Sequence, residues 1–430
     1  MATTQEILNE ISKNSIQCNT PMDKPQQDDK FLAIGNDNTG KYIKYSNLVE
    51  DLALYKTQDK TWATVLALIE QGKFGDVYPV GTTFYTPFHY NNQTYQFPWQ
   101  VADTGREVTY PDGSKHVRPI LQALYLIPQQ VQFSQYRAFL KCPQGLAAGT
   151  YNITFGQAWG STLLTADHLN WNFTLTKAVP SGGRVAGFRN FPDSITSADN
   201  LKIRVMDAEG KTVLETVTVT EGTAESGTNL GTLGYTVRNG NLSSMQEAFY
   251  GYNEYHYSAY KQFLDSTAPK NEWWTATDGW DCAPDALATY DGFLSCFDEE
   301  FVSILKTVQV KTAKNTVQGS ASNAYDTDYL RCFLPSLEEM YITPQTSGVE
   351  GAYLPLNKDY VGKDSPNGWW TENANTGLIK YGLISKQANW YRLRSCNRNY
   401  AYNTRGVYSY GNVNNGNARD AGSSLPLVVI

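Results

Sequence analysis

Apolar residues recur at helical spacing in a few short stretches, which predicts short helices. A further helical turn is marked by Ser336, which lies three residues before Glu339 and forms a capping-box pattern with it. Helices therefore account for only short segments of the chain. The predicted helices span residues 3–14, 62–71, 257–266 and 298–305.

Alternating apolar and polar residues predict strands in much of the remaining chain. Residues 31–34 and 41–45 flank a polar turn and predict a β-hairpin. Between residues 131 and 240 the alternating runs are short, and glycine-rich turns separate them, a pattern typical of a β-sandwich. Trp159 and Trp171 are expected to pack in the core of that sandwich rather than to form a platform for sugars. Other strands are predicted at 95–103, 120–127 and 308–312.

Composition narrows the classes of function. A chain of 430 residues is too long for one compact core and indicates two or three domains. Tyr is far more frequent than Phe or Trp, and only 18% of the residues are charged. That profile is typical of a β-rich extracellular or virion protein rather than of a helical enzyme. The net charge of −7 argues against a nucleic-acid-binding protein, which would carry a basic patch.

Signals for membrane insertion, export and metal binding are missing from the sequence. It contains no run of about eighteen apolar residues, and its first residues lack the basic and apolar regions of a signal peptide. The six cysteines are scattered without a Cys-x-x-Cys pair, and there are four histidines, so we expect free thiols and no metal or other cofactor. A protein that acts outside cells without an export signal is expected to be made in the bacterial cytoplasm and released by lysis, as a phage particle is.

Residues 389–430 differ in composition from the rest of the chain. Two anchoring segments, 390–395 and 425–430, enclose a run rich in Asn, Tyr, Arg, Ser and Gly. Tyr provides a large, stiff contact area and Asn provides adaptable hydrogen bonds, as in antibody paratopes. A set of Asn-rich and Gly-rich hairpin turns would have a similar composition, but the density of Tyr favours a binding face. The residues expected on that face are Tyr391, Asn397, Asn399, Tyr400, Tyr402, Asn403, Tyr408, Tyr410, Asn412, Asn414, Asn415 and Asn417.

This ending resembles the variable region of phage adhesins of the C-type lectin fold, which retroelements diversify mainly at Asn-type codons. In that family an opening strand with a Trp and a nearby Arg-Ser, and a final apolar strand, stay fixed. Trp390, Leu393, Arg394 and Ser395 match the opening strand, and residues 425–428 match the final one. The resemblance implies that Trp390 and Leu393 build the core, and that Arg394 and Ser395 support the displayed loops.

A second resemblance, to formylglycine-generating-enzyme-like domains of the same lectin-fold group, covers residues 80–130 and 241–430. It depends on the order of the segments 97–103, 253–266, 297–301, 333–339 and 390–395. It implies an α+β fold, in which a C-type-lectin-like domain carries an inserted β-sandwich and a small N-terminal helix-hairpin attachment segment. The expected parts are residues 1–75 for attachment or oligomerisation, 76–130 and 241–430 for the lectin-like domain, 131–240 for the inserted sandwich, and 389–420 for the variable binding face.

Catalysis is disfavoured by the residues near this face. Formylglycine-generating enzymes use reactive cysteines with a metal, whereas Cys396 has no cysteine partner at a suggestive spacing and no nearby His. The sugar-binding motifs Glu-Pro-Asn and Trp-Asn-Asp of calcium-dependent lectins are absent. Glu338 and Glu339 are neighbours on a helical turn and point apart, so they are a poor carboxylate pair. A surface turn explains Asp278 and Asp281 more simply than a cation site does.

The expected function is that of a non-enzymatic phage receptor-binding adhesin of the tail-fibre or head-fibre type, on the virion surface. Its expected partners are a host-surface protein or glycan at the binding face, and other virion proteins at the N-terminal segment. Assembly as a homotrimer would multiply weak contacts into avidity. Trp369 and Trp370 would rim the face or pack beneath it. Two alternatives remain: a formylglycine-generating-like enzyme, and a structural decoration protein whose Asn/Tyr face packs against a neighbouring subunit.

Overall fold

The structure is a computed structural model with two compact units, Met1–Lys73 and Phe74–Ile430. For the strands before residue 45, for those between residues 139 and 236 and for the pair at 362–363, only the backbone is described. The described residues are 30–34, 40–44, 61–135, 139–142, 147–157, 170–181, 183–186, 201–206, 213–219, 234–236, 250–277, 281–317, 320–321, 323–343, 350–360, 362–363 and 376–430.

The first unit contains a hairpin and a helix. The hairpin pairs β1 (Lys30–Ile34) with β2 (Gly40–Lys44) in antiparallel register, as the alternating pattern predicts. The helix α3 (Trp62–Glu70) begins after Thr61, whose hydroxyl accepts the N–H of Thr64, and it ends just before Gly72. Both elements confirm the predictions from the sequence. The helix predicted at 3–14 lies outside the described residues.

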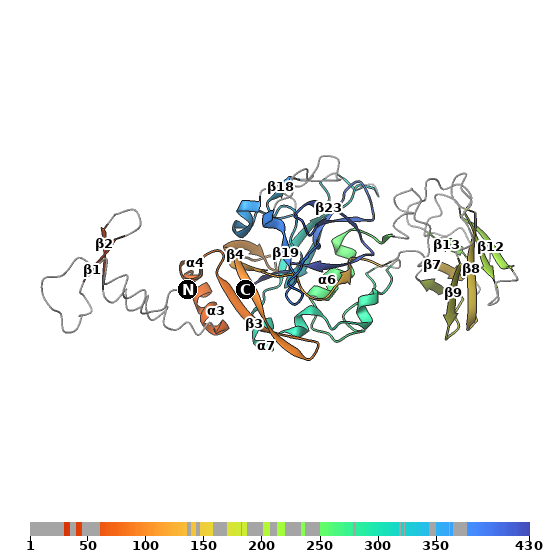
Figure 1. The fold of residues 1–430 in the computed structure, drawn as a ribbon, viewed down its shortest axis with the longest axis horizontal. Helices are drawn as coiled ribbons and strands as arrows, with labels where there is room; N and C mark the ends of the chain where they lie inside the picture. Colours follow the sequence, from red (N-terminus) through yellow and green to blue (C-terminus); the bar gives the residue numbers. More distant parts are fainter. Residues whose placement is uncertain are drawn as a thin grey trace. The chain divides into compact units, whose positions relative to one another are not determined.

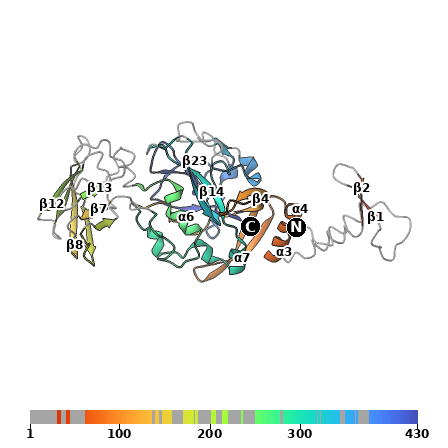
Figure 2. The same ribbon diagram turned by 180° about the vertical axis from the view of Figure 1, so that it is seen from behind.

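The second unit contains a five-stranded antiparallel sheet that joins the two ends of this unit. Its order is β16-β25-β5-β4-β3, so the last strand of the chain lies between β16 and β5. Val428 pairs with Leu121 across this join, and Figures 1 and 2 mark the C-terminus among the strands of the second unit. The strands are β3 (Thr83–Tyr90), β4 (Gln93–Thr109), β5 (Lys115–Ala123), β16 (Cys332–Phe333) and β25 (Leu427–Val429).

A second five-stranded sheet is built mainly from the C-terminal stretch. Its order is β23-β22-β21-β24-β6; β21 and β24 are parallel, and the other neighbours are antiparallel. The final forty residues therefore contribute to both large sheets of the unit. The strands are β6 (Val131–Gln132), β21 (Tyr391–Cys396), β22 (Asn403–Val407), β23 (Val413–Asn417) and β24 (Ala421–Ser424).

An aromatic cluster forms part of the core between the first sheet and the short helices. Trp99 lies with its ring centroid 4.8 Å from that of Phe97 and 5.6 Å from that of Phe301, and Phe88 lies 5.2 Å from Phe297. Such tilted contacts add to the stabilisation from apolar burial. The helices are α4 (Phe74–Val77), η2 (Tyr255–Tyr257), α6 (Ala259–Leu264), η3 (Asp285–Ala288), η4 (Phe293–Cys296), α7 (Glu299–Ile304), η5 (Pro355–Tyr360) and η6 (Thr376–Leu378).

Among the described residues of this unit outside 139–236, three two-stranded pairs accompany the two large sheets. The predicted strand at 308–312 is confirmed as β14, and the helices predicted at 257–266 and 298–305 are confirmed as α6 and α7 in shorter form. None of the described helices is long and apolar enough to cross a membrane. The pairs are β14 (Val308–Ala313) with β15 (Tyr325–Leu330), β17 (Ile342–Thr343) with β18 (Gly362–Lys363), and β19 (Lys380–Tyr381) with β20 (Ala388–Asn389).

Within the described chain, the strands between residues 139 and 236 pair only with one another. They form two antiparallel sheets, of order β10-β7-β13 and β12-β11-β8-β9. The predicted start of this region at residue 131 is wrong, because Val131 and Gln132 form β6 and pair with β24. The side chains of Trp159 and Trp171 lie outside the description. The strands are β7 (Phe139–Cys142), β8 (Gly149–Gln157), β9 (Asn170–Leu175), β10 (Gly183–Ala186), β11 (Leu201–Met206), β12 (Val213–Val219) and β13 (Gly234–Thr236).

The fold class of the protein is α+β, with most strands in antiparallel sheets and few helices. The insertion of the 139–236 strands into a single domain remains a prediction, and the pairing of β25 with β5 and of β24 with β6 is what such an insertion requires.

Candidate binding face

The predicted face rests on a strand that is buried on both sides. All six residues of β21 are buried, and the strand lies between β22 and β24 in its sheet. Tyr391 is completely buried, and its hydroxyl donates to the carbonyl oxygen of Leu378 at 3.0 Å. Its predicted place on the exposed face is therefore wrong. Leu393 is also completely buried, as expected for a core residue.

Arg394 fixes β21 to the neighbouring loops from inside the protein. Its guanidinium pairs with both carboxylate oxygens of Glu339, at 2.5 and 3.0 Å. It also donates to the carbonyl oxygens of Lys311 at 3.2 Å and Leu334 at 2.8 Å, and to that of Glu350. Burial acts to lower the pKa of Arg394, but the charge of Glu339, its hydrogen bond and the charge of Glu350 together outweigh burial and raise that pKa. Arg394 is thus a charged, fully engaged support.

The residues next to Arg394 extend the same support. The Ser395 hydroxyl donates to a carboxylate oxygen of Glu350 at 2.6 Å and accepts the N–H of Leu337 at 3.0 Å. Ser336 and Glu339 form the predicted capping box, with reciprocal bonds of 3.1 and 3.0 Å at the turn that begins at Leu337. These contacts are local and structural, so Arg394 and Ser395 lie under the face rather than on it.

Arg392 contacts a different set of residues and holds the later turns. It is completely buried and donates to Thr404, to the carbonyl oxygen of Asn417 at 2.6 Å and to that of Asp420 at 2.5 Å. Its guanidinium also lies 4.8 Å from the centre of the Trp390 ring. Burial lowers the pKa of Arg392 to about 10, so it remains charged at neutral pH. Trp390 is only partly buried.

One buried amide organises the loop between β21 and β22. The side-chain nitrogen of Asn253 donates to the carbonyl oxygens of Asn397 at 2.9 Å, Tyr400 at 2.6 Å and Asn403 at 2.7 Å. Asn315 in turn donates to the Asn253 side-chain oxygen at 3.0 Å. The backbone of residues 397–403 is therefore held from below, while the side chains of Asn399, Tyr400, Tyr402 and Asn403 remain at least partly exposed.

Asn397 belongs to this inner layer. It is 1% exposed, its side-chain nitrogen donates to the Asn415 side chain at 3.1 Å, and its side-chain oxygen accepts the N–H of Asn399. Its predicted place on the exposed face is wrong, because the polar side chain fixes a turn. Asparagine composition alone does not separate these two roles.

Tyrosine rings cluster where the loop meets a residue from outside the C-terminal stretch. Tyr402 stacks on Tyr250 with ring centroids 5.1 Å apart, and Tyr400 meets Tyr402 at 5.7 Å. The Arg419 guanidinium lies 5.1 Å from the centre of the Tyr250 ring. Burial raises the pKa of Tyr402 to about 12, with smaller contributions from Tyr400 and Tyr250, so the phenol stays neutral. Sequence reasoning missed Tyr250, although it begins a short Tyr-rich run.

A second tyrosine pair lies on the hairpin of β22 and β23. Tyr408 and Tyr410 are stacked, with ring centroids 5.7 Å apart and planes 3° apart. The Tyr408 hydroxyl donates to the Asn415 carbonyl oxygen at 3.3 Å, and Arg405 donates to the Asn415 side chain at 2.7 Å. Tyr410 is 50% exposed and forms the outermost aromatic surface of this group.

The structure thus separates the predicted residues into an outer and an inner set. The outer set has Asn399 and Tyr410 exposed and the others partly exposed, while Tyr391 and Asn397 are buried. We call this outer set, with Tyr250, the tyrosine–asparagine face. Its predicted members are Asn399, Tyr400, Tyr402, Asn403, Tyr408, Tyr410, Asn412, Asn414, Asn415 and Asn417.

The catalytic candidates near the face are engaged in structural contacts. Cys396 is buried and its thiol donates to the Ala313 carbonyl oxygen at 3.2 Å, and burial raises its pKa well above the usual range. A buried thiol with a raised pKa is a poor nucleophile. Glu339 is paired with Arg394, so it does not form a carboxylate pair with Glu338. Among the described residues, Cys296, Cys332 and Cys396 are free thiols.

Other candidates from the sequence do not assemble into a site. Asp281 accepts the N–H of Thr277 at 2.7 Å, as in a surface turn, while Asp278 lies outside the described residues. Trp369 and Trp370 lie outside them as well. Within the described ranges, no three His, Cys, Asp or Glu residues are grouped as a metal site would require.

Comparison with known proteins gives one family. Comparison with curated proteins finds no match, and comparison with solved structures finds none. Residues 209–425 match the family described as domain of unknown function (DUF6273). This segment includes every residue of the tyrosine–asparagine face and begins among the 139–236 strands, between β11 and β12. Because the match spans half of the chain, the protein belongs to the DUF6273 family.

Proposed function

We propose that the protein is a non-enzymatic phage adhesin of the virion surface, whose tyrosine–asparagine face binds a host-surface protein or glycan. The observation that carries this proposal is the layering of the C-terminal stretch. Buried Arg392 and Arg394 fix the backbone from inside, while Tyr and Asn side chains remain accessible on the outside. Aromatic anchors among adaptable polar groups form an efficient recognition surface.

The same layering supports diversification of the face. A variable surface needs a backbone that is held by residues outside the varied positions, so that each new side chain is displayed without unfolding the loop. Asn253 and Arg392 hold carbonyl oxygens of the loop backbone rather than side chains. Substitution at Asn399, Tyr400 or Asn414 therefore leaves these hydrogen bonds in place.

We further propose that the second unit is a C-type-lectin-like domain with an inserted β-sandwich. Support comes from the pairing of the last strand, β25, with the early strand β5, which closes the domain on itself. The buried thiol of Cys396, with its raised pKa, gives no support to the alternative of a formylglycine-generating-like enzyme. In this proposal the N-terminal unit attaches the protein to other virion proteins, and a trimer provides avidity.

Phage particles that carry variants of this protein would test the proposal. Replacing both Tyr400 and Tyr402 with Ala is expected to weaken attachment to host cells about tenfold or more, because central aromatic anchors carry much of the energy of such interfaces. Tyr85 is 59% exposed on β3, so Tyr85→Ala is a matched control that should leave attachment unchanged.

Attachment and assembly are measured on the same particles. Normal attachment of the double variant would refute a receptor-binding role for this part of the face. Failure of the particles to assemble, with attachment of the surviving particles intact, would instead favour the structural decoration alternative.

A further inference from the structure

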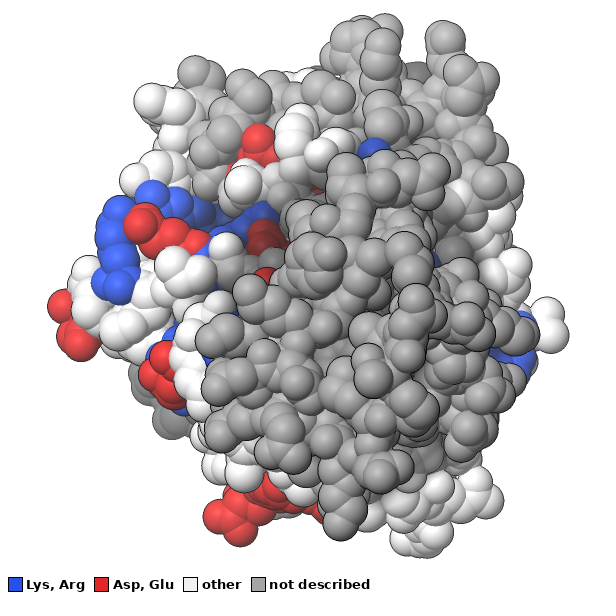
Figure 3. Space-filling view, turned by 90° about the vertical axis from the view of Figure 1, so that its left-hand side faces the viewer, with Lys and Arg blue, Asp and Glu red and all other residues white. Residues whose placement is uncertain are grey.

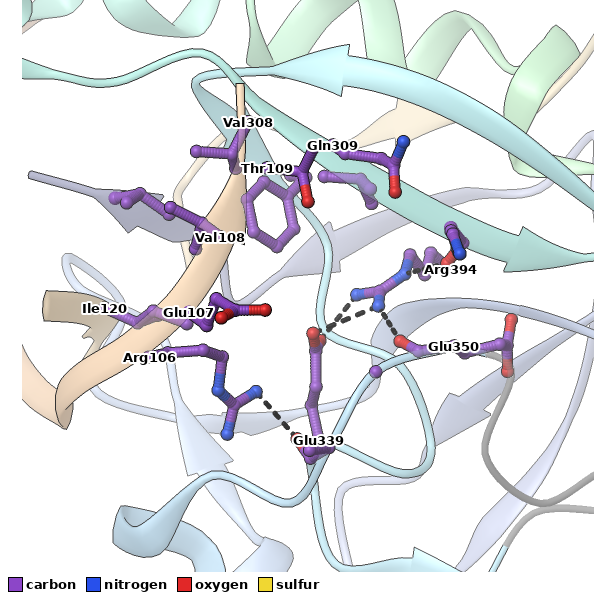
Figure 4. A pocket seen from close by; sticks show the side chains of 16 residues that line it. Arg106, Glu107, Val108, Thr109, Ile120, Val308, Gln309, Glu339, Glu350 and Arg394 are labelled. Carbon is purple, nitrogen blue, oxygen red and sulfur yellow. Dashed lines mark hydrogen bonds and ion pairs between the residues drawn. The ribbon is translucent and has the colours of Figure 1, made fainter. Parts of the chain in front are cut away.

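A pocket of about 410 Å³ lies on the second unit, apart from the tyrosine–asparagine face. Arg106 and Glu107 from β4 form one wall, Gln309 and Lys311 from β14 form another, and the loop of Glu339 closes it (Figure 4). Its volume is within the range of about 300–1,000 Å³ that is usual for small-molecule sites. Of residues 389–420, only Arg394 lines it, so the pocket is a separate site.

The charges that line the pocket cancel. Arg394 and Glu339 neutralise each other as a bidentate pair, and Figure 4 shows this pair on the side opposite β4. Figure 3, which shows one face of the molecule, also has basic and acidic side chains next to one another rather than in a patch of one sign. A neutral ligand therefore fits the pocket better than an anion or a cation. The ionisable lining residues are Arg106, Lys311 and Arg394, and Glu107, Glu339 and Glu350.

Polar groups at the rim retain hydrogen-bonding capacity. One carboxylate oxygen of Glu107 accepts from Lys115 at 2.7 Å, which leaves the second oxygen for a ligand. Gln309 donates to the Tyr329 hydroxyl at 3.4 Å with one amide hydrogen and keeps its oxygen. The Lys311 ammonium lies 4.8 Å from the centre of the Tyr325 ring and has three donors. The rim thus offers both donors and acceptors.

The inner surface and the surroundings of the pocket are apolar or aromatic. Val108, Phe333 and Val429 line it and are each at most 8% exposed. Beside the opening, Tyr325 and Tyr329 are 46% and 41% exposed on β15. A ligand with hydroxyl groups on its edge and C–H groups on its faces would satisfy both kinds of surface.

The walls are held in place without a ligand. Arg106 donates to the carbonyl oxygens of Ala352 at 2.8 Å and Tyr353 at 2.6 Å, and it pairs with Asp103 at 3.0 Å. Tyr353 in turn stacks on Tyr341 with ring centroids 4.3 Å apart. Segments far apart in the sequence are therefore fixed against each other, and a preformed site loses less entropy on binding.

From these observations we propose that the pocket binds a neutral, hydroxyl-rich ligand the size of a monosaccharide or disaccharide. Glu107, Gln309 and Lys311 bind the hydroxyl groups, and the valine and phenylalanine side chains cover the C–H face. This site is distinct from the tyrosine–asparagine face and does not depend on its proposed function.

Saturation-transfer NMR with the full chain tests this assignment. The probes are glucose, galactose, N-acetylglucosamine and lactose, with glucosamine and glucuronate as charged comparators. At least one neutral probe is expected to bind, and Gln309→Ala is expected to weaken its binding about three- to tenfold through the lost hydrogen bonds. Gln309→Trp, which fills the opening, is expected to abolish it.

Tyr410→Ala, on the other face, is the matched control and should leave this binding unchanged, and a thermal melt verifies that each variant is folded. The proposal is overturned if no neutral probe binds, if binding survives Gln309→Trp, or if a charged comparator binds more tightly than every neutral probe. Loss of binding in Tyr410→Ala but not in Gln309→Trp would move the site to the tyrosine–asparagine face and likewise overturn it.

Discussion

Arg392 and Arg394 are both buried and lie two residues apart in β21. The charge of each is compensated in a different way. Arg394 has a carboxylate partner, Glu339, whereas Arg392 is surrounded by carbonyl oxygens, a hydroxyl and the Trp390 ring. A buried cation is tolerated only when nearly all its donors are engaged. Through these contacts the two arginines tie the C-terminal stretch to the surrounding loops.

Replacing Arg394 with Met is expected to lower the free energy of unfolding by about 3–5 kcal/mol, because Glu339 would be left as a buried, unpaired carboxylate. Denaturant unfolding of the two proteins measures the difference. Arg419→Met is the control, since Arg419 forms a more exposed pair with Asp420 at 3.7 Å and should change stability by less than about 1 kcal/mol. Equal effects of the two substitutions would contradict the assigned role of Arg394.

A cluster around Asp328 predicts a dependence of stability on pH. Burial acts to raise the pKa of Asp328, but the hydrogen bond from His256 at 3.0 Å and the charge of Lys261 at 2.7 Å outweigh it and hold the pKa below its usual value. The folded-state pKa is thus below the unfolded one. The cluster stabilises the protein fully above the unfolded pKa, and this contribution is lost as pH falls through the folded pKa.

Asp328→Asn is accordingly expected to lower the free energy of unfolding by about 1.5–3 kcal/mol at pH 7. The difference from the wild-type protein should be constant above about pH 5 and shrink below about pH 4. Urea unfolding across this range measures it. A difference that grows toward acid pH would show that the sign of the shift is wrong.

Which of these residues the sequence could predict depends on how local their contacts are. Ser336 and Glu339 form their capping box within one turn, so spacing alone predicted it. Tyr391 was misplaced because β21 is buried on both sides and shows no alternation. Asn397 was misplaced because its partner, Asn415, lies on another strand.

At the level of elements, the packing of β21 against its neighbours depends on Trp390, the residue just before β21, whose ring lies close to the neighbouring strands. A Cβ atom added at Gly422 in β24 would lie 2.7 Å from this ring, whereas one at Gly416 in β23 would lie 3.4 Å away. The ring therefore packs directly against the backbone of β24. The glycine in β24 is required by this contact, and the one in β23 is less constrained.

Gly422→Ala is expected to lower the free energy of unfolding by about 1–3 kcal/mol through overpacking against Trp390. Gly416→Ala, the matched substitution, should have a smaller effect because its new methyl group is at ordinary contact distance. Thermal unfolding of the two variants compares them. If Gly416→Ala were the more destabilising, Trp390 would not be the feature that limits this part of the sheet.

The loop between β21 and β22 provides a prediction for the face itself. Asn253→Ala removes the amide group whose two hydrogens are shared among three loop carbonyls, without touching a face side chain. Hydrogen exchange of the amides at residues 398–403 is expected to become about tenfold faster or more, because each lost bond contributes about 1 kcal/mol. Asn399→Ala, an exposed control, should leave exchange unchanged. Unchanged exchange in Asn253→Ala would mean that the loop is held by other contacts.

The sequence predicted which helices and strands form more reliably than it predicted where they begin and end. The helices α3, α6 and α7 and the strand β14 were predicted because each has its own periodic pattern or cap. The two-residue strand β6 was not, since its pairing with β24 depends on residues almost three hundred positions away. The pocket between β4 and β14 was missed for the same reason, because no local pattern brings these two strands together.

At the scale of the whole molecule, the described residues that flank the 139–236 strands, Ser134 before them and Gly251 after them, lie close together. A Cβ atom added at Gly251 would lie 2.7 Å from the Ser134 carbonyl oxygen, and Gly251 has a φ of +79°. Phe133 and Ser134 both donate their N–H groups to the Ala418 carbonyl oxygen, and Arg419 donates to that of Tyr250. Both ends are thus anchored to the same turn after β23. Closely spaced, anchored ends are what an inserted domain needs.

Replacing residues 136–249 with a short Gly-Ser linker is therefore expected to give a folded second unit that keeps the tyrosine–asparagine face. The reason is that the strands in the deleted segment pair only with one another in the described chain, while every strand of the two large sheets remains. Near-ultraviolet circular dichroism and a cooperative thermal transition measure folding, and the host-attachment assay measures the binding of the face.

A chain in which the same linker replaces residues 397–403 is the control, because it removes part of the face and should lose attachment. An aggregated or non-cooperative product from the first deletion would show that the segment is an integral part of the domain. The family match, which begins at residue 209, would then delimit one structural unit instead of merely overlapping the end of an inserted segment.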